Sequence, residues 1–442
     1  METTNQPHPV DEMLPLGKLF TYGLQHVLAM YAGAVAVPLM VAHALKLPQE
    51  QLIYLINADL FTCGLATIIQ TLGLGKLGIR IPIIQGVTFA AVTPMIIIAQ
   101  QHGITAVYGS IIVAGIVTFL LSPYFSRLLR FFPPVVTGTI ITLIGITLMP
   151  VAVRWAGGGD PSGADFASAP HILLALITLS LVVFFYRYFT GFLSNIAVLL
   201  GLFAGTIIAL PLGMVNLSQL STAGWLGVTT PFAFGLPSFE PGAIAAMILV
   251  MLVTMSETTG DCIAVGEIIG LPITPESLTR GLRADGFSTV LGGILNSFPY
   301  TAFAQNVGLV GLTRVKSRFV VAAAGFILVA LGLFPKMAAI IAAIPTPVLG
   351  GSGIAMFGMV AASGIKTLGK VPFEGTHNLM VIAISLGAGM ITLAVPNFYQ
   401  QFPGWAQIIL NSGITSGSVV AIALNALLNA SPRANGLARI GG

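Results

Sequence analysis

Charged residues are scarce in this sequence. Only 7% of the 442 residues are Asp, Glu, Lys or Arg, whereas a soluble globular domain usually carries about 25%. A chain with so few charges lacks the polar surface that water requires. This scarcity excludes an ordinary soluble domain and indicates a membrane protein.

Cysteine is equally scarce. Cys63 and Cys262 both lie in apolar runs, so neither a disulfide framework nor a thiolate metal site is expected. The stretch from Met1 to Pro15 is polar and acidic and has no basic segment before an apolar one, so we expect no cleaved signal peptide. The phosphate-binding pattern G-x-x-x-x-G-K-[ST] is missing, which leaves direct coupling to ATP unsupported.

Long apolar runs are abundant, since 56% of the residues are hydrophobic. A helix that crosses the hydrocarbon core needs about 20 such residues. Eleven runs meet this requirement, and three more are shorter or are interrupted by Pro, Gly and polar residues. The eleven are 19–40, 52–74, 104–124, 131–153, 171–188, 191–211, 241–266, 317–334, 337–360, 377–394 and 406–428, and the three are 81–99, 277–296 and 298–313. The sequence therefore predicts an all-α polytopic membrane protein with fourteen spans.

The basic residues support this count. With fourteen spans and a cytoplasmic N-terminus, only Lys46, Arg154 and Lys336 of the 18 Lys and Arg residues fall outside. The others, including Arg433 and Arg439, fall on the cytoplasmic side, as the positive-inside rule requires. We therefore expect both termini in the cytoplasm.

The chain also repeats itself weakly. The segment 132–138 resembles 345–351 at an offset of 213 residues, and the same offset aligns Thr88 with Thr301. Seven spans in each half would give the halves opposite orientations. Inverted repeats with interrupted segments at matching positions indicate a secondary transporter with a binding site at the membrane midplane.

Two carboxylic acids lie one helical turn apart in the span 241–266. Glu257 and Asp261 share one face of this helix. Two carboxylates so close in a medium of low dielectric do not both ionise readily, so at least one is a natural proton carrier. The alternative is that a protonated carboxyl only forms a hydrogen bond to a neighbouring helix.

Other polar groups also lie at membrane depth, where ionisable side chains are costly and call for an explanation. Asp285 could organise the site or could pair with Arg283, and Asp59 is expected to form a structural hydrogen bond. His26, next to Gln25, is either a packing group or part of the site. A single His without a second ligand argues against an intramembrane metal enzyme, and we predict no metal and no cofactor.

The interrupted segments 81–90 and 298–308 each begin with a Pro and a β-prone stretch and then turn helical. Extended backbone is tolerated at this depth only where it is paired or lines a cavity. If the two stretches pair, two helix N-termini face one cavity and favour an anionic or acceptor-rich ligand. The amide of Gln305 suits a planar heterocycle, and Phe89 and Phe303 offer faces for stacking.

Three motifs carry a family resemblance. The segment Gln305 to Arg314 resembles the signature Q-N-x-G-x-x-x-x-T-R of the nucleobase–ascorbate transporters, Gln25-His26 resembles their QH motif, and Ser256 to Asp261 resembles their span-eight acidic motif. The resemblance extends from Gly23 to about Asn429 and implies two inverted repeats of seven spans, with extended stretches in spans three and ten. It also implies a core domain (residues 15–125 and 240–335) and a gate domain (residues 126–212 and 336–430), with a homodimer formed through the gate.

The resemblance further implies the site residues. Glu257 and Gln305 would hold the substrate, with backbone groups of Phe89 and Ala304. Further residues would serve proton coupling or organise the site: His26, Gln25, Asp261, Asp285 and Asn306. Members of the urate type do not always have an acid at Asp261, and fewer residues separate Asp261 from Asp285 than in some xanthine permeases.

The signature begins with Gln, which resembles the branch of bacterial urate and xanthine permeases. Thr88 stands where xanthine-selective members often have Asn, so its smaller side chain leaves room for the C8 oxo group of urate. The expected function is proton-coupled import of urate or xanthine across the bacterial inner membrane, with no enzymatic activity and no nucleic-acid partner. The alternatives are a uracil or broader nucleobase permease and an uncoupled facilitator or channel.

Overall fold

The protein is built almost entirely of helices. The computed structural model describes residues 8–374 and 376–429. Within these residues, seven helices are long and apolar enough to cross a membrane, or up to nine if each of two bent pairs counts as one span. Arg433, Arg439 and the last residue of the expected gate segment, residue 430, lie outside the described residues.

The elements follow the expected order. The first half contains a 3-10 turn Pro9–Asp11, α1 (Leu16–Ala44), α2 (Gln49–Leu72), β1 (Gln85–Val87), a 3-10 turn Phe89–Ala91, α3 (Val92–His102), α4 (Ile104–Leu121), 3-10 turns Ser122–Tyr124 and Leu129–Phe131 around α5 (Phe125–Leu128), α6 (Pro134–Ala156), α7 (Ala169–Tyr188), α8 (Phe192–Asn195), α9 (Ala197–Ala209) and α10 (Ser218–Thr222). The second half contains α11 (Pro241–Ile269), α12 (Pro275–Ile294), β2 (Tyr300–Ala302), α13 (Ala304–Thr313), α14 (Arg318–Gly332), α15 (Pro335–Ala342), α16 (Thr346–Leu368), α17 (Asn378–Ala394), α18 (Gly404–Leu410) and α19 (Gly413–Asn429).

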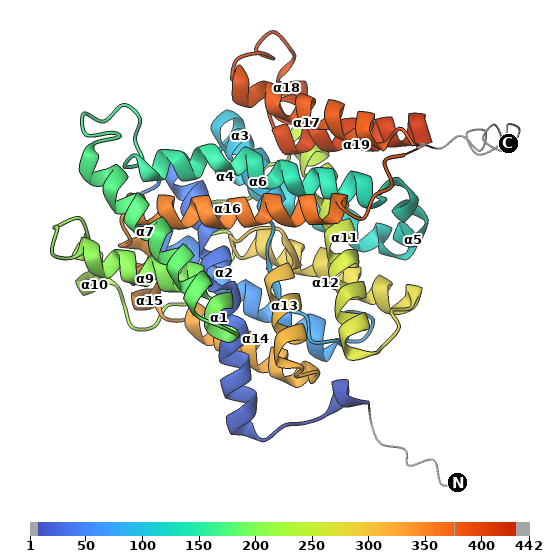
Figure 1. The fold of residues 1–442 in the computed structure, drawn as a ribbon, viewed down its shortest axis with the longest axis horizontal. Coiled ribbons are helices and arrows are strands. Elements are labelled where there is room, and N and C mark those ends of the chain that lie inside the picture. The colour runs from blue at the N-terminus through green and yellow to red at the C-terminus, as the bar shows by residue number, and fades with distance from the viewer. Residues whose placement is uncertain (1–7, 375, 430–442) are drawn as a thin grey trace, which may run out of the picture.

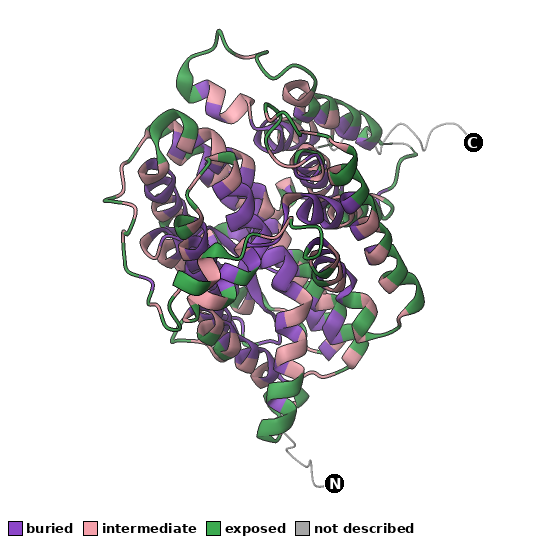
Figure 2. Cartoon of the chain, turned by 90° about the vertical axis from the view of Figure 1, so that its left-hand side faces the viewer, coloured by how far each residue is buried: buried purple, intermediate pink, exposed green. Residues whose placement is uncertain are grey.

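Helices from the two halves of the chain pack in pairs. α2 packs along α14, α4 packs along α12, and α6 packs along α16; the last pair lies side by side across the middle of Figure 1. The two similar segments found in the sequence both open a long helix, since Pro134 is the first residue of α6 and Pro347 the second residue of α16. The buried residues gather along the centre of the molecule in Figure 2, with exposed residues on its outer helices and loops.

Three of the expected continuous spans are broken. The run 337–360 is not one helix: α15 ends at Ala342, and α16 begins only at Thr346. Pro345 and Pro347 explain the break because a residue before proline avoids the helical conformation. α15 instead forms a bent pair with α14, at 82°.

The run 406–428 is likewise bent by 81° between α18 and α19. Ser412 marks this break, because its hydroxyl oxygen accepts a hydrogen bond from Thr415 N at 3.2 Å, as a helix-capping residue does. The run 191–211 is also interrupted, at Ile196 between α8 and α9.

The segment between α10 and α11 is hydrogen-bonded to residues near the ends of α2, α4 and α12. The Tyr54 hydroxyl at the start of α2 and the Asn296 amide after α12 donate to Thr230 O at 2.9 and 2.8 Å. Ser238 N donates to Thr105 O near the start of α4 at 3.2 Å. We refer to residues 227–239 as the strap. Its partners all belong to α2, α4, α12, α14 and their adjoining loops.

A close approach of two glycines sets the crossing of α2 and α14. A Cβ atom added at Gly64 would lie 2.5 Å from Gly325 O and 2.6 Å from Val329 N. Gly64→Ala should therefore separate the helices and lower the free energy of unfolding by about 1–3 kcal/mol. The measurement is the thermal unfolding midpoint of the purified protein in detergent.

The matched control is Gly387→Ala in α17, where an added Cβ meets nothing within 4 Å. Equal midpoints for the two variants would show that the α2–α14 crossing is not limited by this contact.

Candidate functional site

The two interrupted segments contain the expected extended stretches, and these pair with each other. β1 and β2 form an antiparallel two-stranded sheet in which Gln85 faces Ala302 and Val87 faces Tyr300. Every residue of both strands is buried. The polar backbone of these strands is therefore paired at the centre of an otherwise helical protein.

Side chains from two long helices complete the outer edges of this sheet. On the β1 side, Thr67 Oγ1 of α2 accepts from Gln85 N at 3.0 Å, and Cys63 Sγ donates to Gln85 O at 2.7 Å. On the β2 side, Thr258 Oγ1 of α11 accepts from Ala302 N at 3.1 Å. The sheet thus has no unpaired edge at these positions, although it consists of only two short strands.

Each strand leads directly into a helix. The first backbone N–H groups of a helix have no preceding turn to bond to, so the starts at Phe89 and Ala304 offer donors to a ligand. Thr88 caps the first start, since its hydroxyl oxygen accepts from Ala90 N at 3.2 Å. The rings of Phe89 and Phe303, which stand at the two starts, have their centres 6.5 Å apart. Ala304 and Gln305 are exposed, whereas Thr88 is buried.

Gly86 permits this close arrangement. A Cβ atom there would collide with the ring of Phe303 and would approach Met30 Cε to 3.2 Å. Residue 86 of β1 must therefore be glycine, because the Phe303 ring packs directly against the backbone of this strand. This requirement could not be predicted for Gly86 in particular, because the chain contains 51 glycines.

Glu257 lies on α11 directly before Thr258, the residue that holds β2. Both Glu257 and Asp261 are half-buried, and neither carboxylate has a hydrogen bond or ion pair to any residue within 8–374 and 376–429. α11 also packs against the turn at Phe89 and against α13. Glu257 is thus an available carboxyl group on the helix that contacts both helix starts.

Asp285 is fully buried and does not pair with Arg283. Its Oδ1 atom accepts from Gln70 Nε2 of α2 at 3.1 Å, and its other oxygen is buried without a partner in the described part of the chain. The Arg283 guanidinium instead lies over the ring of Phe119, 5.7 Å from its centre. The alternative reading, in which Asp285 pairs with Arg283, is therefore wrong.

His26 and Asn306 are bonded to each other. The Asn306 amide nitrogen lies 3.1 Å from His26 Nδ1 and donates to His26 O at 2.9 Å. Both residues are buried. These hydrogen bonds hold the first turn of α13 against α1. Gln25 is half-buried, and its side chain has no hydrogen bond to the residues that the structure describes.

The predicted structural hydrogen bond of Asp59 is confirmed. Its Oδ1 atom accepts from the hydroxyls of Tyr300 at 3.0 Å and Ser297 at 3.2 Å. Asp59 therefore anchors β2 to α2. Sequence reasoning missed Cys63, Thr67, Thr258 and Gln70, whose contacts become apparent only once the strands are placed against α2 and α11.

Comparison with known proteins assigns the chain to a family. A family model described as "Permease family" matches residues 17–398. The chain belongs to the nucleobase–ascorbate transporter family. It is thus a multi-pass membrane transporter and not an enzyme.

Several relatives are similar over nearly the whole chain. The xanthine permease of Bacillus subtilis is 46% identical and covers 93% of this chain and 94% of its own. The uric acid transporter UacT of Escherichia coli is 44% identical and covers 97% and 90%. The nucleobase transporter PlUacP of Paenibacillus larvae is 47% identical and covers 93% and 94%.

Solved structures show a similar fold at low sequence identity. The transmembrane domain of the cyanobacterial bicarbonate transporter BicA superposes with a TM-score of 0.64 at 15% identity, over 93% of this permease and all of that chain. SLC26A9 gives a TM-score of 0.61 at 12% identity, over 94% of this permease and 66% of that chain. The fold is therefore shared with transporters of these families.

The contact between α11 and β2 can be tested with one substitution. Thr258→Val leaves Ala302 N–H buried without an acceptor, which should lower the free energy of unfolding by about 1–3 kcal/mol. Thermal unfolding of the purified permease measures the change.

Thr254→Val is the control, because its hydroxyl donates only to Val250 O of its own helix, at 2.9 Å. If both variants unfold at the same temperature, Thr258 does not hold the strand.

Proposed function

We propose that this permease imports an oxidised purine, xanthine or urate, by proton symport. The support is twofold. Relatives at 44–47% identity are named as xanthine, uric acid and nucleobase permeases. The paired strands, which bring together two helix starts and the phenylalanine rings at these starts, suit a flat heterocycle with polar edges. This arrangement is the observation that carries the proposal.

In the proposed binding mode, the purine lies near Phe89 and Phe303. The exposed amide of Gln305 donates to a ring carbonyl and accepts from an adjacent ring N–H, since an amide can do both. Backbone N–H groups at Phe89 and Ala304 bond other acceptors on the ligand. Glu257 accepts from a ring N–H on the opposite edge.

In the proposed coupling, Glu257 exchanges the transported proton. It lacks a side-chain partner within residues 8–374 and 376–429, so its carboxyl group is free to bond the substrate or the proton. Asp261 on the same face and Asp285 beside Gln70 assist the proton transfer, while His26 holds Asn306 in place. Gln25 borders this group on α1.

We further propose the architecture of fourteen spans in two inverted repeats. A two-fold relation between the halves would exchange the pair α2–α14 with the pair α4–α12 and keep α6–α16 as one pair, which fits the observed packing. Residues 15–125 and 240–335 form the core, and residues 126–212 and 336–430 form the gate and the interface of a homodimer.

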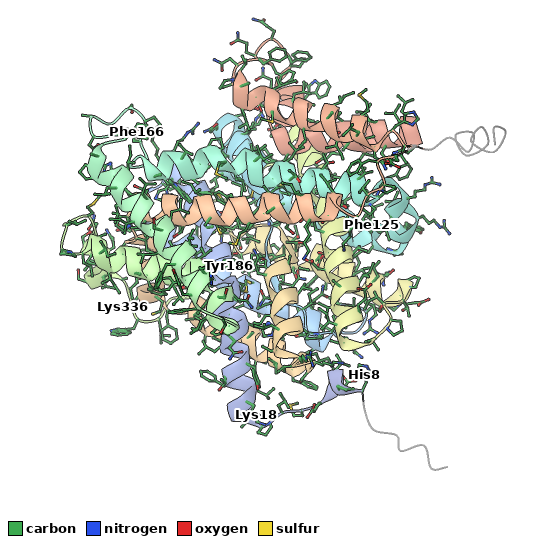
Figure 3. All side chains as sticks on the ribbon, in the orientation of Figure 1. His8, Lys18, Phe125, Phe166, Tyr186 and Lys336 are labelled. Atoms are coloured by element: carbon green, nitrogen blue, oxygen red, sulfur yellow. The ribbon has the colours of Figure 1, made fainter. Side chains whose placement is uncertain are left out.

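The proposed location is the inner membrane with cytoplasmic termini. In Figure 3, Phe166 and Lys336 lie on the left, whereas Phe125 and His8 lie on the right. This separation supports an outer side that contains Lys336 and an inner side that contains His8 and the basic residues next to Phe125.

Glu257→Gln should abolish gradient-driven accumulation of purine while the protein still inserts and folds, because an amide cannot exchange a proton. Purified wild type and variant in liposomes would be given labelled xanthine or urate, with and without an imposed proton gradient. Full accumulation of purine by the variant would show that Glu257 is not needed for proton coupling.

The same assay separates the alternative functions. A broader nucleobase permease, favoured by the name of the Paenibacillus relative, would show competition by uracil at similar concentrations. An uncoupled facilitator would equilibrate xanthine without responding to the gradient. Wild type that takes up neither purine would refute the proposed function.

Thr88→Asn tests the preference for urate. Asn is also a good helix-capping residue, so the variant keeps the bond to Ala90 N and changes mainly the size of a buried side chain. Overpacking near the C8 oxo group should weaken urate relative to xanthine by about 1–3 kcal/mol, tenfold or more. Competition assays give the ratio directly, and an unchanged ratio would show that Thr88 does not select the substrate.

A further inference from the structure

A mostly apolar cavity lies beside α1, and Gln305 is not among the residues that line it. It is bounded by α1, α6, α9, α16 and the residues around α15. Its lining includes Tyr31, Leu39, Trp155, Leu202, Ser352 and Met356. In the proposed domains, α1 belongs to the core and α6, α9 and α16 to the gate, so this cavity lies on the boundary between them.

Two hydroxyl groups in this lining have no hydrogen-bond partner within the described residues. Tyr31 is 7% exposed and Ser352 is 2% exposed, and the oxygen of each side chain is buried and unpaired. Almost all other lining atoms are apolar. Buried polar groups are normally paired, so two unpaired hydroxyls, one from each proposed domain, indicate that this boundary meets a polar partner in another state.

Aromatic contacts connect α16, which lines the cavity, with the helix starts. Phe357 follows the lining residue Met356 on α16, and its ring meets Phe89 edge-on with the centres 6.0 Å apart. The centre of the Phe89 ring in turn lies 6.5 Å from that of Phe303. Phe357 is fully buried. The packing of Phe357 on Phe89 therefore joins a wall of the cavity to the first helix start.

Tyr31 also lies close to the proposed substrate site along the chain. It follows His26, which bonds Asn306, by five residues on α1, a rise of about 7.5 Å. The cavity has about 30 Å³ open to the centres of water molecules, which is room for roughly two waters. In this conformation it is too small for a purine.

We propose that this cavity is the collapsed outer vestibule of the permease, and that the Tyr31 and Ser352 hydroxyls bind the incoming purine before it reaches the central site. When core and gate separate on the outer side, the contact of Phe89 with Phe357 opens and the cavity widens. A hydroxyl both donates and accepts, so this pair fits the alternating N–H and C=O groups of an oxidised purine. The inference rests on the proposed function and adds two specificity-determining residues to it.

The test compares uptake from the two sides of the membrane. Tyr31→Phe and Ser352→Ala each remove one hydroxyl and little volume. Each should raise the KM for labelled xanthine in intact cells by roughly fivefold, the effect of one lost hydrogen bond. In inside-out vesicles, where the substrate enters from the cytoplasmic side, the KM should change by less than twofold.

Ser385→Ala is the matched control. Ser385 is fully buried, and its hydroxyl donates to Val381 O at 2.6 Å, so its removal should leave the KM on both sides unchanged. A second variant, Ser352→Leu, fills the cavity. It should prevent uptake by cells while the purified protein in detergent still binds xanthine with the wild-type Kd.

The outcomes separate the two proposals. An unchanged KM in cells for both hydroxyl variants, or an equal rise on both sides, overturns the vestibule and leaves a cavity that holds only water. Normal uptake by Ser352→Leu also overturns it. Wild type that transports no purine overturns the proposed function and the vestibule together, whereas the preceding results overturn the vestibule alone.

Discussion

The architecture depends on one constraint: extended backbone inside a membrane protein must have all its hydrogen-bonding groups paired. Two strands of three residues cannot meet this requirement alone, because each has a free edge. Here Thr67 and Cys63 of α2 bond the backbone of Gln85 on one edge. On the other edge, Thr258 of α11 accepts from Ala302 N and Thr289 of α12 accepts from Tyr300 N. The arrangement holds both helix starts at fixed positions, so the donors they offer are positioned before any ligand arrives.

The same constraint explains the contacts of several polar residues of α2 and α11. Gln70 meets Asp285, Asp59 meets Tyr300, and Thr258 meets Thr301 and Ala302 N. Each contact joins α2 or α11 to β2 or to α12, the helix that precedes β2. These polar groups thus stabilise the extended backbone and the helix before it. Glu257 differs from them because its carboxylate makes no such hydrogen bond within the described residues.

Much of this arrangement could be predicted from the sequence. The prolines and β-prone residues at 81–90 and 298–308 indicated extended stretches. Their pairing was one of two ways to accommodate such backbone in an apolar medium, the other being to line a cavity. The hydrogen bond of Asp59 followed from its isolation in an apolar helix. Thr67, Cys63 and Thr258 could not be found, because small polar residues are common in membrane helices and their partners are distant in sequence.

The helix breaks show a second limit. Hydropathy averages over a window, so a kink at Ser412 or Ile196 leaves no trace in it, although Pro345 and Pro347 could have indicated the break before α16. The role of Phe357 was also invisible, because its contact with Phe89 joins residues 268 positions apart.

The strap shortens the free connection between α9 of the proposed gate and α11 of the proposed core. Between α9 and α11 the sequence offers residues 210–240, but the bonds of Thr230 to Tyr54 and Asn296, and of Ser238 to Thr105, fix the second part of this stretch to α2, α4 and α12. Only residues 210–226 remain as the connection between α9 and the strap. Inserted residues or an affinity tag should therefore be tolerated near Gly213, where an added Cβ meets nothing within 4 Å, and should be disruptive within the strap.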